Sequence, residues 1–130
     1  MSTPTSQVAA GLINQLAGVN ITMVPSPLQM AVKIASLTRH VRLTTAVVVL
    51  PIRDMRVLAG EIATVDHLSN GRINVGVGSG WMPEEFAAAS ASHLFPRRHG
   101  HVRETIEILK GIWTNDLFEY HGEFADFQRS

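Results

Sequence analysis

Two short runs of apolar and β-branched residues, separated by a stretch with helical periodicity, constrain the fold of this chain most. The first run, Val41–Leu50, reads VRLTTAVVVL and is apolar almost without a break from Thr44 onward. The second run, Arg72–Val77, reads RINVGV. An almost continuous apolar run is typical of a strand that is covered on both faces in a parallel sheet. We therefore expect an α/β fold with two adjacent parallel strands and a right-handed helical crossover between them.

The segment between the two runs carries the start and stop signals of a single helix. Asp54 can accept hydrogen bonds from the amides of a first helical turn, and Asn70-Gly71 is a typical helix stop. The residues expected on its buried stripe are Leu58, Ile62 and Val65. The order strand, helix, strand is that of a parallel βαβ unit.

Flanking helices are expected on both sides of this unit. Ser26-Pro27 predicts a helix start, with proline in the first turn, and that helix is expected to end near His40. Its apolar face is expected to include Leu28, Ala31 and Ala35 and to be widened by Met30, Ile34 and Leu37. A weaker helical pattern covers residues 5–17.

On the carboxyl-terminal side, Pro83 predicts a short helix and residues 97–114 a longer one. The longer helix is expected to bury Val102, Ile106, Leu109 and Trp113 and to pair Arg103 with Glu107 on its other face. The tail alternates around His121-Gly122, which predicts a small hairpin.

Composition excludes several classes of function. The 130 residues carry 11 basic and 11 acidic side chains and no cysteine. No basic block indicates a nucleic acid partner, and no thiolate chemistry is available. The apolar runs are much shorter than the roughly 20 residues of a membrane span, and the amino terminus lacks the pattern of a signal peptide. The expectation is a soluble, cytoplasmic protein without a nucleic acid or membrane partner.

Metal binding is not expected. His99 and His101 lie two apart on a predicted helix and therefore point in different directions, and no other spacing matches a metal site.

Three alternating glycines follow the second strand and precede a large ring. Gly76, Gly78 and Gly80 stand just before Trp81 in the stretch VGVGSGWM. In parallel α/β folds the ligand site lies at the carboxyl ends of the strands, where this stretch falls. The spacing is not the GxGxxG of a dinucleotide site. Two interpretations stay open: the glycines admit a flat group or a phosphate to the backbone, or they only serve a tight strand exit and close packing.

Four stretches together resemble the luciferase-like flavin-dependent monooxygenases, a family that includes bacterial luciferase and reductases that use coenzyme F420. They are TTAVVVLP, LAGEIATVDHLSNGRINVGVGSGWMPEEF, RHGHVRETIEILKGIWT and FEYHGEFADF. The resemblance runs from about Pro25 to Gln128, and residues 1–24 match poorly. It implies a (β/α)8 barrel, which needs roughly 250 residues. The chain is therefore expected to form a single partial barrel domain, equivalent to the third and fourth strands with their helices.

The resemblance also implies a cofactor, FMN or coenzyme F420, and places residues around it. Ala46 and Val47 match the end of the third strand, which supports the flavin ring, often through a non-prolyl cis peptide bond. Gly78 matches a position that removes bulk near the ring, and Trp81 and Met82 match positions that face it. Luciferases have a basic residue where this chain has Ser79, so a weaker hold on the phosphate is expected.

By resemblance, the chain is an oxidoreductase or monooxygenase that transfers a hydride or activates O2 on a small organic substrate. No catalytic residue is assigned, because the family's catalytic histidine and acid come from the first two strands. The alternative is a non-catalytic fragment or interaction module that retains the barrel segment. Two parallel strands leave unpaired sheet edges. We therefore expect association with a second copy or with a partner that supplies barrel strands; the alternative is coverage by residues 1–24.

Overall fold

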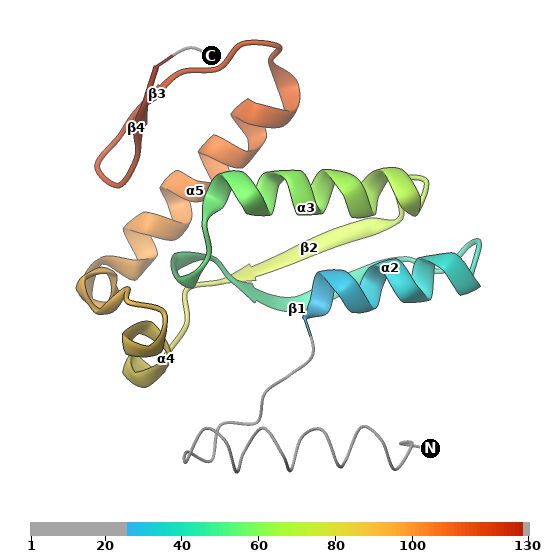
Figure 1. Ribbon diagram of the computed structural model, residues 1–130, viewed down its shortest axis with the longest axis horizontal. Helices are drawn as coiled ribbons and strands as arrows, with labels where there is room; N and C mark the ends of the chain where they lie inside the picture. Colours follow the sequence, from blue (N-terminus) through green and yellow to red (C-terminus); the bar gives the residue numbers. More distant parts are fainter. Residues whose placement is uncertain (1–25, 129–130) are drawn as a thin grey trace.

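The computed structural model describes residues 26–128, so the helix expected over 5–17 and the poorly matching segment 1–24 lie outside the described residues. Figure 1 shows a pair of adjacent strands with helices packed beside it and a small hairpin near the carboxyl terminus. The elements are α2 (Pro27–Leu37), β1 (Leu43–Val49), a 3-10 turn (Leu50–Ile52), α3 (Met55–Leu68), β2 (Ile73–Gly78), α4 (Pro83–Ala88), a second 3-10 helix (Ser92–Arg97), α5 (Arg98–Thr114), β3 (Tyr120–His121) and β4 (Asp126–Phe127).

The two predicted strands pair in parallel, as the βαβ order predicted. β1 and β2 form a two-stranded sheet that begins with Leu43 beside Ile73. The signals for the helix between them are also confirmed. The Asp54 carboxylate accepts hydrogen bonds from the backbone amides of Arg56 and Val57 at 2.9 and 3.0 Å. The mixed α/β fold with a parallel pair and a small antiparallel hairpin is therefore the one that the sequence indicated.

The expectation that β1 is covered on both faces is wrong for the described part of the chain. Leu43, Thr45 and Val48 are buried against the helices, whereas Ala46 and Val47 are exposed. The apolar composition of β1 fits a complete barrel, in which further strands would enclose the second face. Here α2 and α3 contribute most of the buried core, and the second face of the strand stays open.

The widened face of α2 is also uncovered. Leu28, Ala31 and Ala35 enter the core as expected. Met30, Ile34 and Leu37 remain 47%, 40% and 72% exposed. The helix ends at Leu37, before the expected end near His40, and Ser26 stands at the N-cap position without a side-chain cap hydrogen bond.

The face of α5 was only partly predicted. Leu109 is buried, but Trp113 is 43% exposed and donates from Nε1 to the carbonyl of Ala59 at 3.1 Å. Glu107, which was expected to pair with Arg103, accepts a 2.8 Å hydrogen bond from the Tyr120 hydroxyl. Helical spacing alone predicted Arg103 as the partner of Glu107. The hairpin packs along α5, and its Tyr120 binds Glu107 instead.

Arg72 joins the start of β2 to the end of α2. Its Nε donates to the carbonyl of Ser69 at 2.7 Å. Its two terminal nitrogens donate to the carbonyls of Ala35, Thr38 and Val41 and to the Thr38 hydroxyl, at 2.9 to 3.1 Å. The carbonyls at a helix end lack intrahelical partners and carry partial negative charge, so a cation is favoured there. Sequence reasoning missed this contact.

Glu104 fastens the hairpin to α5. Its buried carboxylate accepts three backbone N–H groups, from Glu123, Phe124 and Ala125, at 3.0, 2.9 and 2.8 Å. Gly122 leaves room for this contact, since a Cβ there would lie 2.2 Å from Glu104 Oε1. The described chain therefore ends in a hairpin that is tied to the helix by its backbone.

Candidate functional site

The regular pairing of β1 with β2 is interrupted where the resemblance placed the flavin ring. The register shifts between Thr45 and Val48, so Ala46 and Val47 form an irregular stretch near Gly76. The peptide bond between Ala46 and Val47 is cis, as the resemblance implied. Both side chains are exposed, and Ala46 also lines a groove beside α2.

Close packing within the chain accounts for Gly76. A Cβ on Gly76 would lie 2.1 Å from the carbonyl oxygen of Thr45 and 3.3 Å from its carbonyl carbon. The irregular stretch of β1 brings this backbone atom against β2, where only a hydrogen atom fits. The packing interpretation of the glycines therefore holds at this position.

Gly78 and Gly80 are also close to protein atoms. A Cβ on Gly78 would lie 2.7 Å from Val47 Cγ2, and one on Gly80 would lie 2.8 Å from a ring carbon of Phe86. Gly80 has φ +77°, a conformation that side chains rarely adopt. The structure explains all three glycines without a ligand, so the role of Gly78 beside a cofactor rests on the resemblance.

The remaining predicted site residues lie on the turn that follows β2. Ser79 and Met82 are half-buried, and Trp81 is 76% exposed. Arg98 of α5 holds this turn by a 3.1 Å hydrogen bond from Nε to the carbonyl of Gly80. Of the predicted residues, the structure thus places Val47 close beside Gly78 and Trp81 on the turn that follows β2.

The sequence analysis did not select Arg98, although an arginine at the first position of a helix is itself unusual. Its guanidinium also donates to the carbonyl of Phe95 at 2.8 Å and lies 4.2 Å from the centre of the Phe95 ring. An arginine at the start of a helix is not explained by the helix dipole, which favours acids there. Such a residue indicates a tertiary partner, which here is the carbonyl of Gly80 in the turn that follows β2.

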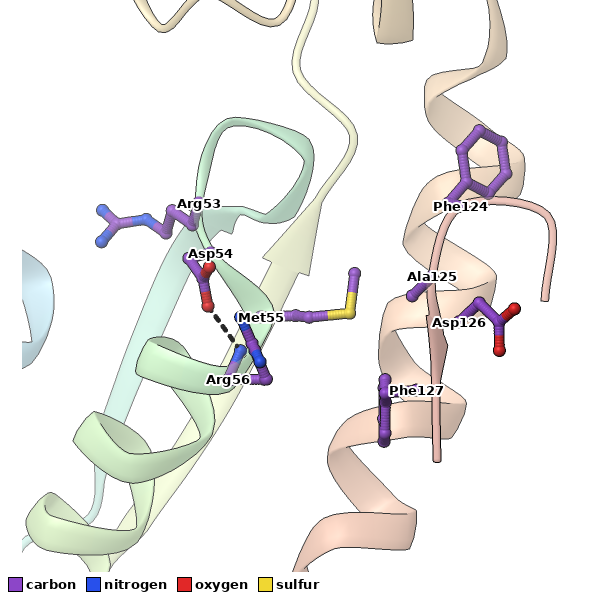
Figure 2. A pocket seen from close by; sticks show the side chains of 8 residues that line it. All are labelled: Arg53, Asp54, Met55, Arg56, Phe124, Ala125, Asp126 and Phe127. Carbon is purple, nitrogen blue, oxygen red and sulfur yellow. Dashed lines mark hydrogen bonds between the residues drawn. The ribbon is translucent and has the colours of Figure 1, made fainter. Parts of the chain in front are cut away.

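A pocket of about 360 Å³ lies between the start of α3 and the hairpin. Figure 2 shows Met55 pointing across this pocket toward the hairpin, while the guanidinium of Arg53 points away from it. Arg53 Nε is buried and has no hydrogen-bond partner among the described residues. The pocket includes none of the residues predicted to hold a cofactor.

His101 and Tyr120, which lie outside the turn that follows β2, have shifted pKa values. Burial lowers the pKa of His101, against an opposing effect of the Glu104 carboxylate, and His93 lowers it further. Burial and the hydrogen bond to Glu107 raise the pKa of Tyr120 to about 12. Over residues 26–128, no group of three or more histidine and carboxylate side chains is arranged to hold a metal ion, and no helix is long and apolar enough to cross a membrane.

The His101 shift predicts a pH dependence of stability. Its folded pKa lies below the ordinary value of 6.5, so the unfolded chain takes up a proton first as the pH falls. The contribution of His101 to the free energy of unfolding is therefore complete above about pH 6.5 and is lost as the pH falls through the folded pKa. Urea unfolding at pH 7.5 and 5.5 should show a smaller difference in His101→Gln than in the unsubstituted chain.

The exposed His99, two residues away, provides the matched control. His99→Gln should retain the pH dependence of the unsubstituted chain. If the free energy of unfolding changed equally with pH in the two variants, its pH dependence would arise from groups other than His101.

Comparison with known proteins identifies the family. The family model for luciferase-like monooxygenases matches residues 9–130, a match that begins before the expected start near Pro25. The chain belongs to the luciferase-like monooxygenase family. Its mixed α/β fold, with the parallel pair of strands, is part of the barrel of that family.

Individual relatives support the assignment. The chain is 34% identical over 111 residues to the oxygenase component of a flavin-dependent trigonelline monooxygenase from Acinetobacter baylyi, covering 85% of this chain and 31% of that protein. It is 44% identical over 70 residues to an FMNH2-dependent dimethylsulfone monooxygenase from Pseudomonas putida, covering 53% and 19%.

Among solved structures, the oxygenating constituent of 3,6-diketocamphane monooxygenase from Pseudomonas putida, in complex with FMN, superimposes with a TM-score of 0.76. The identity is 18%, and the match covers 97% of this chain and 39% of that one. The chain thus spans about a third of the length of the first relatives that it matches.

Proposed function

We propose that this chain supplies the flavin-facing strands of a monooxygenase that uses reduced FMN and O2 to oxidise a small organic compound. The observation that carries the proposal is the open sheet face at the irregular stretch of β1, where Val47 is 51% exposed and lies so near Gly78 that a Cβ there would be 2.7 Å from Val47 Cγ2. One relative is an FMNH2-dependent monooxygenase, which supports reduced FMN as the cofactor.

The residues on the open face fit a flat apolar ring. Ala46, Val47 and Gly78 are small and uncharged, so an isoalloxazine could lie against them without burying an unpaired charge. Trp81 and Met82, on the next turn, would cover an edge of the ring. Reduced flavin supplies the electrons for the reaction when it is bound, and the protein supplies position and exclusion of water.

Tryptophan fluorescence tests this proposal. The chain has two tryptophans, so a Trp113→Phe variant leaves Trp81 as the sole reporter. Titration with FMN should quench its fluorescence in a saturable manner. Parallel titration with coenzyme F420 distinguishes the two cofactors that the resemblance allows.

A pair of matched variants shows whether the ring binds on the predicted face. Val47→Asp should weaken FMN binding by at least about tenfold, because it places an unpaired charge against the ring. Val57→Asp makes the same change at a 60% exposed position on α3 and should have little effect. Equal affinities for the two variants would exclude the Val47 face. Absence of any saturable binding would favour the alternative, a non-catalytic interaction module.

Ser79→Arg is predicted to strengthen binding of the phosphate-bearing flavin. Luciferases resemble this chain in the turn but carry a basic residue there, and a charge-assisted hydrogen bond contributes roughly 1.5 to 3 kcal/mol. The expected gain for FMN is therefore about ten- to a hundredfold, with little change for riboflavin, which lacks the phosphate. Ser92→Arg adds the same charge at an exposed position elsewhere. If riboflavin gains as much as FMN, the turn does not face the phosphate.

A further inference from the structure

The outer edge of β1 has no partner strand among the described residues. Within residues 26–128, β1 pairs only with β2. Leu43 donates its backbone amide toward β2, to the carbonyl of Arg72 at 2.8 Å. Successive amides of a strand point to opposite sides, so the amide of Thr44 points to the outer edge. Such an edge offers its N–H and C=O groups to another strand.

A groove between α2 and β1 runs along this edge. Its volume is about 380 Å³, and its lining includes Pro27, Met30 and Ile34 of α2 together with residues 42–46. Side chains of consecutive strand residues alternate between the two faces of a sheet, so a groove that touches all of them lies at the edge of the strand. Met30 and Ile34 are 47% and 40% exposed. The groove therefore combines an apolar wall with unpaired backbone, and an apolar strand fits both.

The arrangement of α2 and α3 determines where a strand that precedes α2 would lie. Both helices pack side by side (Figure 1) and contribute to one core against the same face of the sheet. The crossover from one parallel strand to the next is right-handed in about 98% of cases. Because the same rule governs β1, α3 and β2, a strand that is joined to β1 through α2 lies beside the outer edge of β1 and not beyond β2.

The chain just before α2 has the sequence of such a strand. Residues 19–24 read VNITMV and carry no charged side chain. The apolar side chains at positions 19, 21 and 23 alternate with polar ones at positions 20 and 22, which gives a strand with one apolar face. Only Pro25 and Ser26 separate this segment from α2, a usual length for the link between a strand and the following helix.

We propose that residues 19–24 form a third parallel strand on the outer edge of β1, with their apolar face packed against Met30 and Ile34. This strand, α2 and β1 then repeat the unit that β1, α3 and β2 form. The added strand would also widen the sheet beside Ala46, which lines the groove. The proposal does not depend on flavin binding or on any segment outside this sequence.

Hydrogen exchange followed by NMR tests the backbone pairing. The amide of Thr44 should exchange within about tenfold of the rate of Leu43, because both would then donate to a neighbouring strand. At an open edge, Thr44 would exchange much faster than Leu43, since no opening of the sheet would be needed to expose it to water.

A matched pair of aspartate variants tests which face of the segment is buried. Ile21→Asp places an unpaired charge against the apolar wall of the groove, so it should release the strand and raise the exchange rate of Thr44 by at least about tenfold. Thr22→Asp adds the same charge on the opposite face and should change that rate little. Circular dichroism checks that the helices of both variants stay folded.

A single cysteine tests the side-chain contact. The sequence contains no cysteine, so Ile34→Cys introduces one thiol in the groove. Alkylation of this thiol by iodoacetamide should be at least about tenfold slower than in Val57→Cys, because the third strand covers it. Val57 lies on α3 and is 60% exposed. Adding Ile21→Asp to the Ile34→Cys chain should remove most of the difference.

Three results would overturn the proposal. Exchange at Thr44 as fast as at an open edge would exclude strand pairing. Equal effects of the two aspartate variants would exclude the predicted face. Protection of Thr44 that is lost when the protein is diluted would identify a second copy of the chain, and not residues 19–24, as the partner of this edge.

Discussion

Gly76→Ala is expected to lower the free energy of unfolding by at least about 3 kcal/mol. The added Cβ would lie 2.1 Å from the carbonyl oxygen of Thr45. That oxygen belongs to the backbone of the paired strand, so it cannot move aside as the end of a flexible side chain could. Relief requires the two strands to separate, with loss of their hydrogen bonds.

Urea unfolding followed by circular dichroism measures this effect, and Gly60→Ala is the matched control. A Cβ on Gly60 has no atom within 4 Å, and Gly60 lies within α3. There the same substitution should stabilise the chain by about 0.5 to 1 kcal/mol, because glycine is the weaker helix former. If both variants were equally stable, the close approach of Thr45 to Gly76 would be incorrect.

Arg72→Lys is expected to lower the free energy of unfolding by about 2 kcal/mol, although it conserves the charge. The guanidinium reaches acceptors on three segments at once, including the carbonyls of Ser69, Val41 and Ala35. A lysine ammonium is a single compact donor and cannot span this set. Each lost charge-assisted hydrogen bond contributes roughly 1.5 to 3 kcal/mol when buried. The total is discounted here because Arg72 is partly exposed to water.

The exposed Arg39, near the same end of α2, provides the comparison. Arg39→Lys should change the free energy of unfolding by no more than about 0.5 kcal/mol, as is usual at the surface. Hydrogen exchange at residues 38–43 should rise in Arg72→Lys alone. If the two lysine variants were equally stable, the several hydrogen bonds of the Arg72 guanidinium would not be needed for stability.

Local signals predicted the elements of the fold well. The two strands, the Asp54 cap and the helix stop at Asn70-Gly71 are each set by a few neighbouring residues, and all are observed. The parallel pairing followed from their order, because a helix between two strands returns the chain to the same end of the sheet, so that both strands run in one direction. The resemblance added the position of the cis peptide bond between Ala46 and Val47.

Burial was predicted less well, because it depends on what covers an element. Met30, Ile34 and Val47 have the residue types of a core, and all three are exposed. Their apolar character suits a complete barrel, whereas the described residues form one layer of helices on one face of two strands. Exposure of such residues cannot be derived from periodicity, which describes the face of an element and not its neighbours.

The sequence by itself thus determined the α-helices of the described residues, the two parallel strands, their order and the family. The tertiary structure alone decided why Gly76 is a glycine, where Arg72 donates and what Glu104 accepts. The contacts of Arg72 reach up to 37 residues along the chain, and those of Glu104 up to 21. Partners so far apart meet only after the strands pair and the helices pack, because no local preference of the backbone brings them together.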